Sequence, residues 1–392
     1  MTKRVKIIVS LVLILSLTMV LFVPASAARN NSGVKRPLRF YSDGKFRIMM
    51  INDSQDTDFA NPMLIDFINR ALDIEKPDLV VFVGDNVADI FIGANEKRVA
   101  KAIDNIIQPL VNRNIPYAVT FGNHDAETGV SNEKQMVDFM SYPNCYANYN
   151  AEATPGVGTY NLPILSSDGK RTAFNVYMME THNKDANGSF DGVHADQIAW
   201  YEQTSNTLKS ANGGKVVLSL LFQHIPACEI YKLLKEVPPG TDGAIRNGTT
   251  WYKLNENLCT GTGVLLEAPY PNSKNRRQYA SWIKQGDIVG AFFGHDHVNS
   301  FMGTTEDGIT MGYNGGSTFR AYGNGDQRSV RIFNISENDP ANYETHLDTY
   351  ADLTNEHFSF YITDITSIRW LDIIITKLYD VFKVLTFGPI IY

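Results

Sequence analysis

The chain has 392 residues, 44% of them hydrophobic, so it can bury a large core in one elaborated domain or in two. Its formal net charge of −7 at pH 7 argues against capture of nucleic acid or of an anionic membrane through a broad basic surface. Three cysteines, Cys145, Cys228 and Cys259, exclude a disulfide-built scaffold and leave room for at most one disulfide; none of them has the short spacing of a cysteine zinc site.

The first 27 residues have the pattern of a secretory signal peptide. Three basic side chains precede an apolar run at 7–22, and residues 24–27 (PASA) carry the small-x-small pattern of a signal peptidase site. We therefore expect a secreted or extracytoplasmic protein, made more acidic by cleavage because three positive charges are removed. If the run stays uncleaved, a membrane-anchored form results. Residues 28–43 would form a linker.

Predicted strands and helices alternate in the first half of the chain. Short apolar runs at Phe46–Ile51, Leu79–Val83 and Tyr117–Phe121 predict buried strands. Apolar residues at helical spacing predict helices at 63–74 and 96–111. Strands that alternate with helices of this length indicate βαβ units and a largely parallel sheet.

The second half favours paired strands. Two runs around a polar turn predict a hairpin at 159–180, a helix follows at 195–208, and residues 237–276, rich in Gly, Pro, Asn and Thr, predict an inserted surface loop. This order predicts an α/β fold of two mixed sheets packed face to face, with helices outside. The remaining predicted strands are 215–222, 288–293, 308–313 and 329–335.

An amphipathic helix is predicted near the C-terminus, at 370–387. Four charged residues recur there at three-to-five-residue spacing among Ile, Leu, Val and Phe. The helix would dock on its own domain or contact a membrane surface or partner. Its charges balance and form no basic face, which weakens the membrane alternative.

Polar side chains follow five of the predicted strands, at the point where each strand ends. Taken alone, each group would be an ordinary polar turn. Ligands of α/β sheets bind at the carboxyl ends of the strands, so five such groups in succession predict one shared ligand. The groups are Asp53-Ser54-Gln55, Gly84-Asp85-Asn86, Gly122-Asn123-His124-Asp125, Gln223-His224 and Gly294-His295-Asp296-His297.

The residue types suit a pair of first-row metal ions. Carboxylate, amide oxygen and imidazole are ligands for divalent first-row ions and for iron. Hydrolysis of a phosphate ester can use two such ions, which activate water and neutralise charge on the phosphate oxygens. One carboxylate must then bridge the ions, and Asp85 is the natural candidate.

The chain contains five motifs in a fixed order: D-x-[HQ], GD-x, GNH[DE], a His after an apolar strand, and GH-x-H. This ordered set resembles the calcineurin-like metallophosphoesterase superfamily. The stretches Phe222–Pro226 and Gly294–Asn299 resemble its purple-acid-phosphatase-like branch. The resemblance covers residues 44–335, taken as one domain, with 336–392 as a C-terminal extension. It implies a four-layer α/β/β/α sandwich with a binuclear centre of Fe, Mn or Zn.

The resemblance also implies roles for single residues. His124 would contact the phosphate and protonate the leaving group, with Asp125 orienting its ring, and a metal-activated hydroxide would attack. Gln55 stands where many relatives have His, so it would ligate directly or act through water or another ligand. Arg320 and Tyr322 are candidates for the substrate rim, and His182 is expected to be structural. The implied ligands are Asp53, Asp85, His297 and Gln55 for the first ion, and Asp85, Asn123, His224 and His295 for the second.

These features predict a secreted metal-dependent phosphohydrolase that acts on a small phosphomonoester or phosphodiester. The alternative is a cell-surface binding protein that keeps the fold without significant turnover; retention of the ligand set argues against it. An extracellular nuclease is a narrower option that the acidic chain disfavours. Substrate choice would depend on loops such as 237–276. Nothing in the sequence predicts the oligomeric state.

Overall fold

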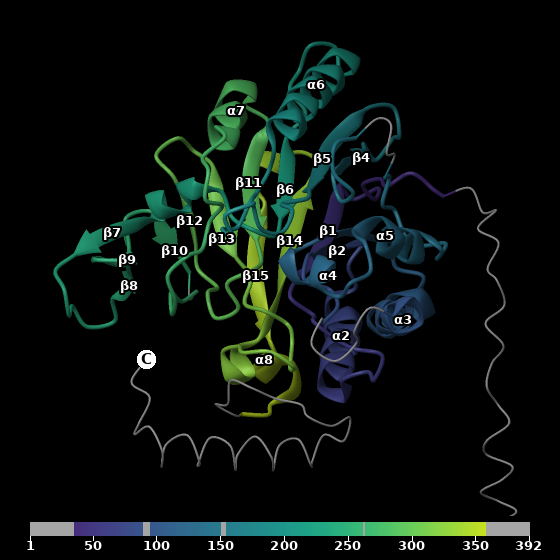
Figure 1. The fold of residues 1–392 in the computed structure, drawn as a ribbon. Coiled ribbons are helices and arrows are strands. Elements are labelled where there is room, and N and C mark those ends of the chain that lie inside the picture. The colour runs from purple at the N-terminus through teal and green to yellow at the C-terminus, as the bar shows by residue number, and fades with distance from the viewer. Residues whose placement is uncertain (1–34, 89–94, 150–153, 262, 358–392) are drawn as a thin grey trace, which may run out of the picture. The chain divides into compact units, whose positions relative to one another are not determined.

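The computed structural model describes residues 35–88, 95–149, 154–261 and 263–357 (Figure 1). The predicted signal peptide and the predicted amphipathic helix at 370–387 lie outside these residues. Within the described ranges, no helix combines the length and apolar character needed to cross a bilayer.

One sheet is built from the βαβ units predicted for the first half of the chain. Its order is β15-β14-β1-β2-β3, with β1, β2 and β3 parallel and β14 and β15 antiparallel to their neighbours. Helices α2 (Pro62–Glu75) and α3 (Glu96–Arg113) make the crossovers. The strands are β1 (Lys45–Ile51), β2 (Leu79–Val83), β3 (Tyr117–Thr120), β14 (Ser329–Ser336) and β15 (Glu344–Thr349).

A second sheet of seven strands has the order β10-β12-β13-β11-β6-β5-β4. The four central strands, β5, β6, β11 and β13, are parallel to one another. Strand β4 pairs antiparallel with β5, β12 with β13, and β10 with β12. Helices α6 (Ala195–Ala211) and α7 (Gln278–Gln285) belong to this half. The strands are β4 (Tyr160–Leu165), β5 (Thr172–Met179), β6 (Ser219–Gln223), β10 (Cys259–Thr260), β11 (Ile288–Phe293), β12 (Met302–Thr304) and β13 (Thr310–Tyr313).

The two sheets pack face to face. Phe333 of β14 contacts Phe222 of β6 at 5.4 Å and Phe292 of β11 at 4.6 Å between ring centroids. The opposite face of the seven-stranded sheet packs on α6, as in the 5.0 Å contact of Tyr177 with Tyr201. Helices α2 and α3 cover the other sheet (Figure 1). The predicted four-layer α/β/β/α sandwich is confirmed.

Two predictions made for less regular regions are wrong in detail. The segment 237–276 is not wholly irregular, because it contributes to a small sheet of β7 (Leu234–Val237), β9 (Thr250–Leu254) and β8 (Ile245–Asn247). These strands have three to five residues each, too few to give a clear alternating pattern. The central strand predicted at 215–222 begins only at Ser219.

The domain also extends beyond the predicted boundary at residue 335. Strand β14 runs to Ser336, and β15 pairs with it along its length. The short helix α8 (Tyr350–Thr354) follows, and Tyr350 packs on Phe67 of α2 at 5.8 Å. The sequence of β15, ETHLDT, is polar because the strand lies at the sheet edge, so it carries little hydrophobic signal.

The other elements are short. Helix α4 (Asn123–Glu127) was predicted only as a turn, and α5 (Asn132–Met140) was not predicted. All three cysteines are free thiols, with Cys145 buried. The 3₁₀ turns are η1 (Cys228–Leu233), η2 (Gly325–Gln327) and η3 (Pro340–Asn342).

Candidate metal centre

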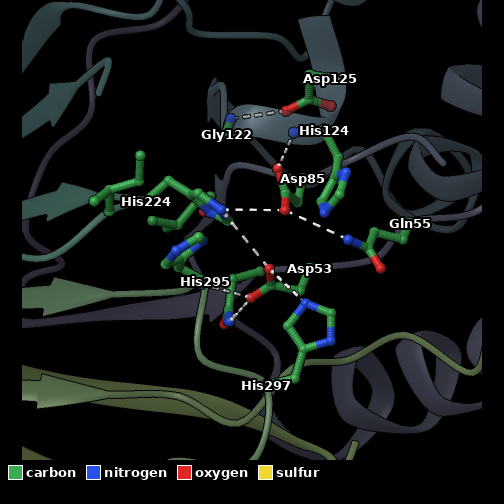
Figure 2. Close-up of polar contacts among 12 residues, drawn as sticks. Asp53, Gln55, Asp85, Gly122, His124, Asp125, His224, His295 and His297 are labelled. Carbon is green, nitrogen blue, oxygen red and sulfur yellow. Dashed lines mark hydrogen bonds and ion pairs between the residues drawn. The ribbon is translucent and has the colours of Figure 1, made fainter. Parts of the chain in front are cut away.

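Side chains from both sheets meet where the strands end. The five-stranded sheet supplies residues after β1, β2 and β3, and the seven-stranded sheet supplies residues after β6 and β11 (Figure 2). The parallel strands of each sheet end at the same edge, so the face-to-face packing brings these ends together. The six side chains are Asp53, Asp85, Asn123, His224, His295 and His297.

Two groups of potential metal ligands share one carboxylate. Asp85, His224 and His295 form one group, and Asp53, Asp85 and His297 form the other; within each group the ligand atoms lie within 4.8 Å of one another. Asp85 Oδ2 is 3.2 Å from His224 Nε2, and Asp53 Oδ1 is 3.2 Å from His297 Nε2. Asp85 belongs to both groups, so it is the residue that could contact two ions if both groups held one.

Backbone carbonyls fix how two of the imidazoles face the carboxylates. His224 Nδ1 donates to Val83 O at 2.9 Å, and His297 Nδ1 donates to Tyr322 O at 2.8 Å. A proton on Nδ1 leaves the lone pair on Nε2, the nitrogen nearest the carboxylates. Metal-binding histidines are typically held by this kind of contact.

The two carboxylates attract positive charge into a buried site. Burial opposes the charged form of His224, but the carboxylates of Asp85 and Asp53 outweigh it and raise the pKa of His224 to about 10. Burial and the charge on His224 lower the pKa of the neighbouring His295 to about 3. The carboxylates thus favour positive charge at this place, which a metal ion would supply by replacing the proton on His224 Nε2, while His295 keeps a neutral, ligating imidazole.

The residues present fit a metal centre. Asn123 Oδ1 is buried with no hydrogen-bond partner among the described residues, and Asp53 Oδ1 and His224 Nε2 are buried with only each other's group and one further ionisable side chain, at 3.2 Å, beside them. Such a buried polar atom costs about 1–3 kcal/mol. A cation would satisfy all three, and a donor set of carboxylate, amide oxygen and imidazole suits Zn, Mn or Fe.

Several site residues have an unusual backbone conformation. Asp53 (φ 51°), Asp85 (φ 51°) and His295 (φ 75°) lie in the left-handed region, as does Gln55 (φ 39°). This conformation costs roughly 1–2 kcal/mol for a residue with a Cβ. Strain of this kind persists where the surrounding structure requires it, often at functional sites.

Two glycines allow the strand-end loops to approach each other. A Cβ on Gly122 would lie 2.2 Å from Asp85 Oδ1 and 2.6 Å from His224 Cδ2. A Cβ on Gly84 would lie 2.7 Å from the Gly122 nitrogen. Glycine at both positions therefore lets Asp85 reach the ligand cluster.

Gly122→Ala is expected to displace Asp85, because the added methyl group has no space. We expect the free energy of unfolding to fall by about 1–3 kcal/mol, as for other overpacked sites, and the bound metal per chain to fall with it. Denaturant unfolding and elemental analysis would measure both. The control Gly213→Ala adds a methyl group with nothing within 4 Å; its φ of 67° can cost stability, but its metal content should stay at the wild-type value. Normal metal content in Gly122→Ala would contradict the close approach.

Gln55 lies at the site with its nitrogen toward the shared carboxylate. Gln55 Nε2 is 3.4 Å from Asp85 Oδ2, and 6% of the residue is exposed. In this orientation the amide donates to Asp85 and does not present its oxygen. Of the two roles predicted for Gln55, the geometry favours the one that acts through another ligand.

The prediction that Asp125 orients the ring of His124 is wrong. Asp125 accepts hydrogen bonds from the backbone nitrogens of Gly122, Asn86 and Val87 at 2.8, 2.8 and 3.2 Å. Burial and the nearby Asp85 carboxylate raise its pKa to about 7, against the effect of these donors. Asp125 therefore ties the loops after β2 and β3 together.

The ring of His124 is instead bound by a carboxylate one helical turn away. Glu127 Oε2 accepts from His124 Nδ1 at 2.8 Å. The backbone nitrogen of His124 donates to Asp85 Oδ1 at 2.8 Å. The i, i+3 spacing in α4 could have indicated this pair, had the segment been predicted as a helix.

Tyr322, considered above as a candidate for the substrate rim, lies against the candidate ligand His297. Its ring is nearly parallel to that of His297, with centroids 4.3 Å apart, and its hydroxyl donates to Glu267 at 3.1 Å. Arg320 instead binds the buried Asp56 at 2.8 Å, a structural contact.

Of the remaining candidates, His182 stacks on His194, the N-cap residue of α6, in keeping with the structural role expected of His182.

A third group of potential ligands, formed by Glu75, His346 and Asp348, lies between α2 and β15. There Arg47 already pairs with Glu75 at 3.0 Å, and the His346 side chain is 45% exposed. This group is therefore a weaker candidate than the strand-end cluster.

Comparisons with known proteins identify the family of the chain. A family model described as calcineurin-like phosphoesterase matches residues 46–299. The chain is 29% identical to a probable inactive purple acid phosphatase 14 of Arabidopsis thaliana, over 76% of this chain and 77% of that protein. It is 27% identical to a probable inactive purple acid phosphatase 29 of the same plant, over 81% and 82%. It is 28% identical to phosphatase DCR2 of Saccharomyces cerevisiae, over 79% and 54%.

Proposed function

Because the chain belongs to the calcineurin-like phosphoesterase family, in its purple-acid-phosphatase-like branch, we propose that it is a metal-dependent hydrolase of phosphomonoesters or phosphodiesters. The observation that supports this most strongly is the sharing of Asp85 by two groups of buried metal ligands. Asp53 and His297 would complete the first site with Asp85. Asn123, His224 and His295 would complete the second.

The reaction would replace the bond between phosphorus and the leaving oxygen with one between phosphorus and a water oxygen. Two bound ions would lower the pKa of that water and neutralise charge on the phosphate oxygens. Asp85 would hold both sites at a fixed separation. His124 would donate a proton to the leaving oxygen, so that an alcohol departs and phosphate or a phosphomonoester remains.

A binding protein that keeps this fold is the competing proposal, favoured by the word inactive in the names of three plant relatives. A chain without turnover has no need to keep a complete ligand set. The set is complete here apart from Gln55, which stands in the place of a histidine. We therefore favour the hydrolase.

Removal of metal is expected to abolish hydrolysis of 4-nitrophenyl phosphate and bis(4-nitrophenyl) phosphate. After dialysis against a chelator, addition of Mn, Fe or Zn should restore activity, with about two ions bound per chain. Elemental analysis and steady-state rates would measure this result. A chain that binds no ion after reconstitution, or that binds two ions and hydrolyses no ester, would contradict the hydrolase and support the binding protein.

We further propose that the protein is exported, on the pattern of its first 27 residues. Its substrate would then be met outside the cytoplasm.

A further inference from the structure

The short helix α4 places a carboxylate beside the proposed acid. His124 and Glu127 are separated by one turn, which puts both side chains on the same face. The ring nitrogen Nδ1 of His124 is 2.8 Å from Glu127 Oε2. The backbone nitrogen of His124 is held by Asp85 at 2.8 Å, which fixes the base of the side chain. The contact with Glu127 then sets the direction of the ring, which turns toward Asp85 (Figure 2).

A second segment holds Glu127 in place. Lys184, from the segment after β5, approaches the other carboxylate oxygen of Glu127 at 3.5 Å. In the same segment, Phe190 packs edge-on against His295, with ring centroids 4.3 Å apart. Lys184 Nζ lies 5.9 Å from the centre of the Phe190 ring. The segment thus connects Glu127 with the ligand cluster on the other sheet.

We propose that Glu127 is the positioning residue for His124, which it holds so that Nε2 meets the leaving oxygen of the substrate. The inference rests on the proposed hydrolase function and adds a residue to it. Asp125, the carboxylate nearest to His124 in sequence, is bound to three backbone nitrogens and ties two loops together. A charged acceptor on Nδ1 keeps a proton on that nitrogen and fixes the ring.

The dependence on the leaving group tests this role. A phenol with a nitro substituent leaves readily as an anion, whereas unsubstituted phenol needs a proton from the acid. Glu127→Gln is therefore expected to lower kcat for phenyl phosphate by roughly 10-fold to 100-fold, at or below the lower end of the contribution of a general acid. The rate on 4-nitrophenyl phosphate should change much less. Lys184→Met should also lower kcat for phenyl phosphate more than kcat for 4-nitrophenyl phosphate, but by a smaller factor than Glu127→Gln.

Both rates should be measured with the metal-loaded full chain, together with the metal content of each variant. Glu133→Gln, an exposed carboxylate of α5, is the matched control and should leave both rates unchanged. An equal loss on both esters, or a parallel loss of metal, would overturn the role of Glu127 while the hydrolase proposal stands. A wild-type chain that hydrolyses neither these two monoesters nor bis(4-nitrophenyl) phosphate would overturn the proposed function, and this inference with it.

Discussion

Asp85→Asn is expected to lower kcat/KM for a phosphate ester by roughly 10³-fold or more, about 4 kcal/mol in the activation free energy. The amide has nearly the same shape but no charge, and Asp85 is the residue that belongs to both ligand groups. Its loss would weaken both ion sites at once. The amide nitrogen could also face His224 Nε2, now 3.2 Å from Asp85 Oδ2, where a donor would oppose metal binding. Rates and bound metal per chain would be measured together.

The control for this variant is Asp73→Asn. Asp73 lies on α2 in an exposed ion pair with Arg113, and such pairs contribute little. It should keep wild-type rates and metal content. An Asp85→Asn protein with two bound ions and undiminished turnover would contradict the shared-ligand assignment.

His124→Asn is expected to lower kcat by roughly 10²-fold to 10⁴-fold on esters of weakly acidic alcohols, the usual contribution of a general acid. Metal content should stay at the wild-type value, because His124 belongs to neither ligand group. Steady-state kinetics with phenyl phosphate and elemental analysis would separate the two effects. His346→Asn, a half-exposed histidine on β15, is the control. If metal is lost in proportion to activity, His124 is a ligand and not the acid.

The buried strands could be predicted closely from the sequence, whereas the edge strands could not. The run Ile288–Phe293 is predicted with the bounds that β11 has, because a strand covered on both faces is a continuous apolar run. Strand β15 is polar, and β8 has only three residues. Such strands are specified by their pairing with neighbours, which a local pattern does not contain.

The location of the site could be predicted, because ligands collect at strand ends whatever the details of packing. The hydrogen-bond and packing partners of single side chains could not be predicted from the sequence. Asp125 is next to His124 in sequence, but consecutive residues of a helix point in different directions, and the residue three positions on shares its face. The contacts of Tyr322 with His297 and of Lys184 with Glu127 join distant segments. They depend on tertiary packing alone.

The division of the candidate ligands between the two sheets has a consequence for folding. Three follow strands of one sheet and three follow strands of the other, so a bound ion would cross-link the halves of the sandwich. The ion would bind only the closed sandwich, and at a concentration 100 times its Kd it would add about 2.7 kcal/mol to stability. Binding of the metal and packing of the two sheets against each other would then be linked equilibria. A chain that folds with the ion present would therefore be more stable than one that folds without it.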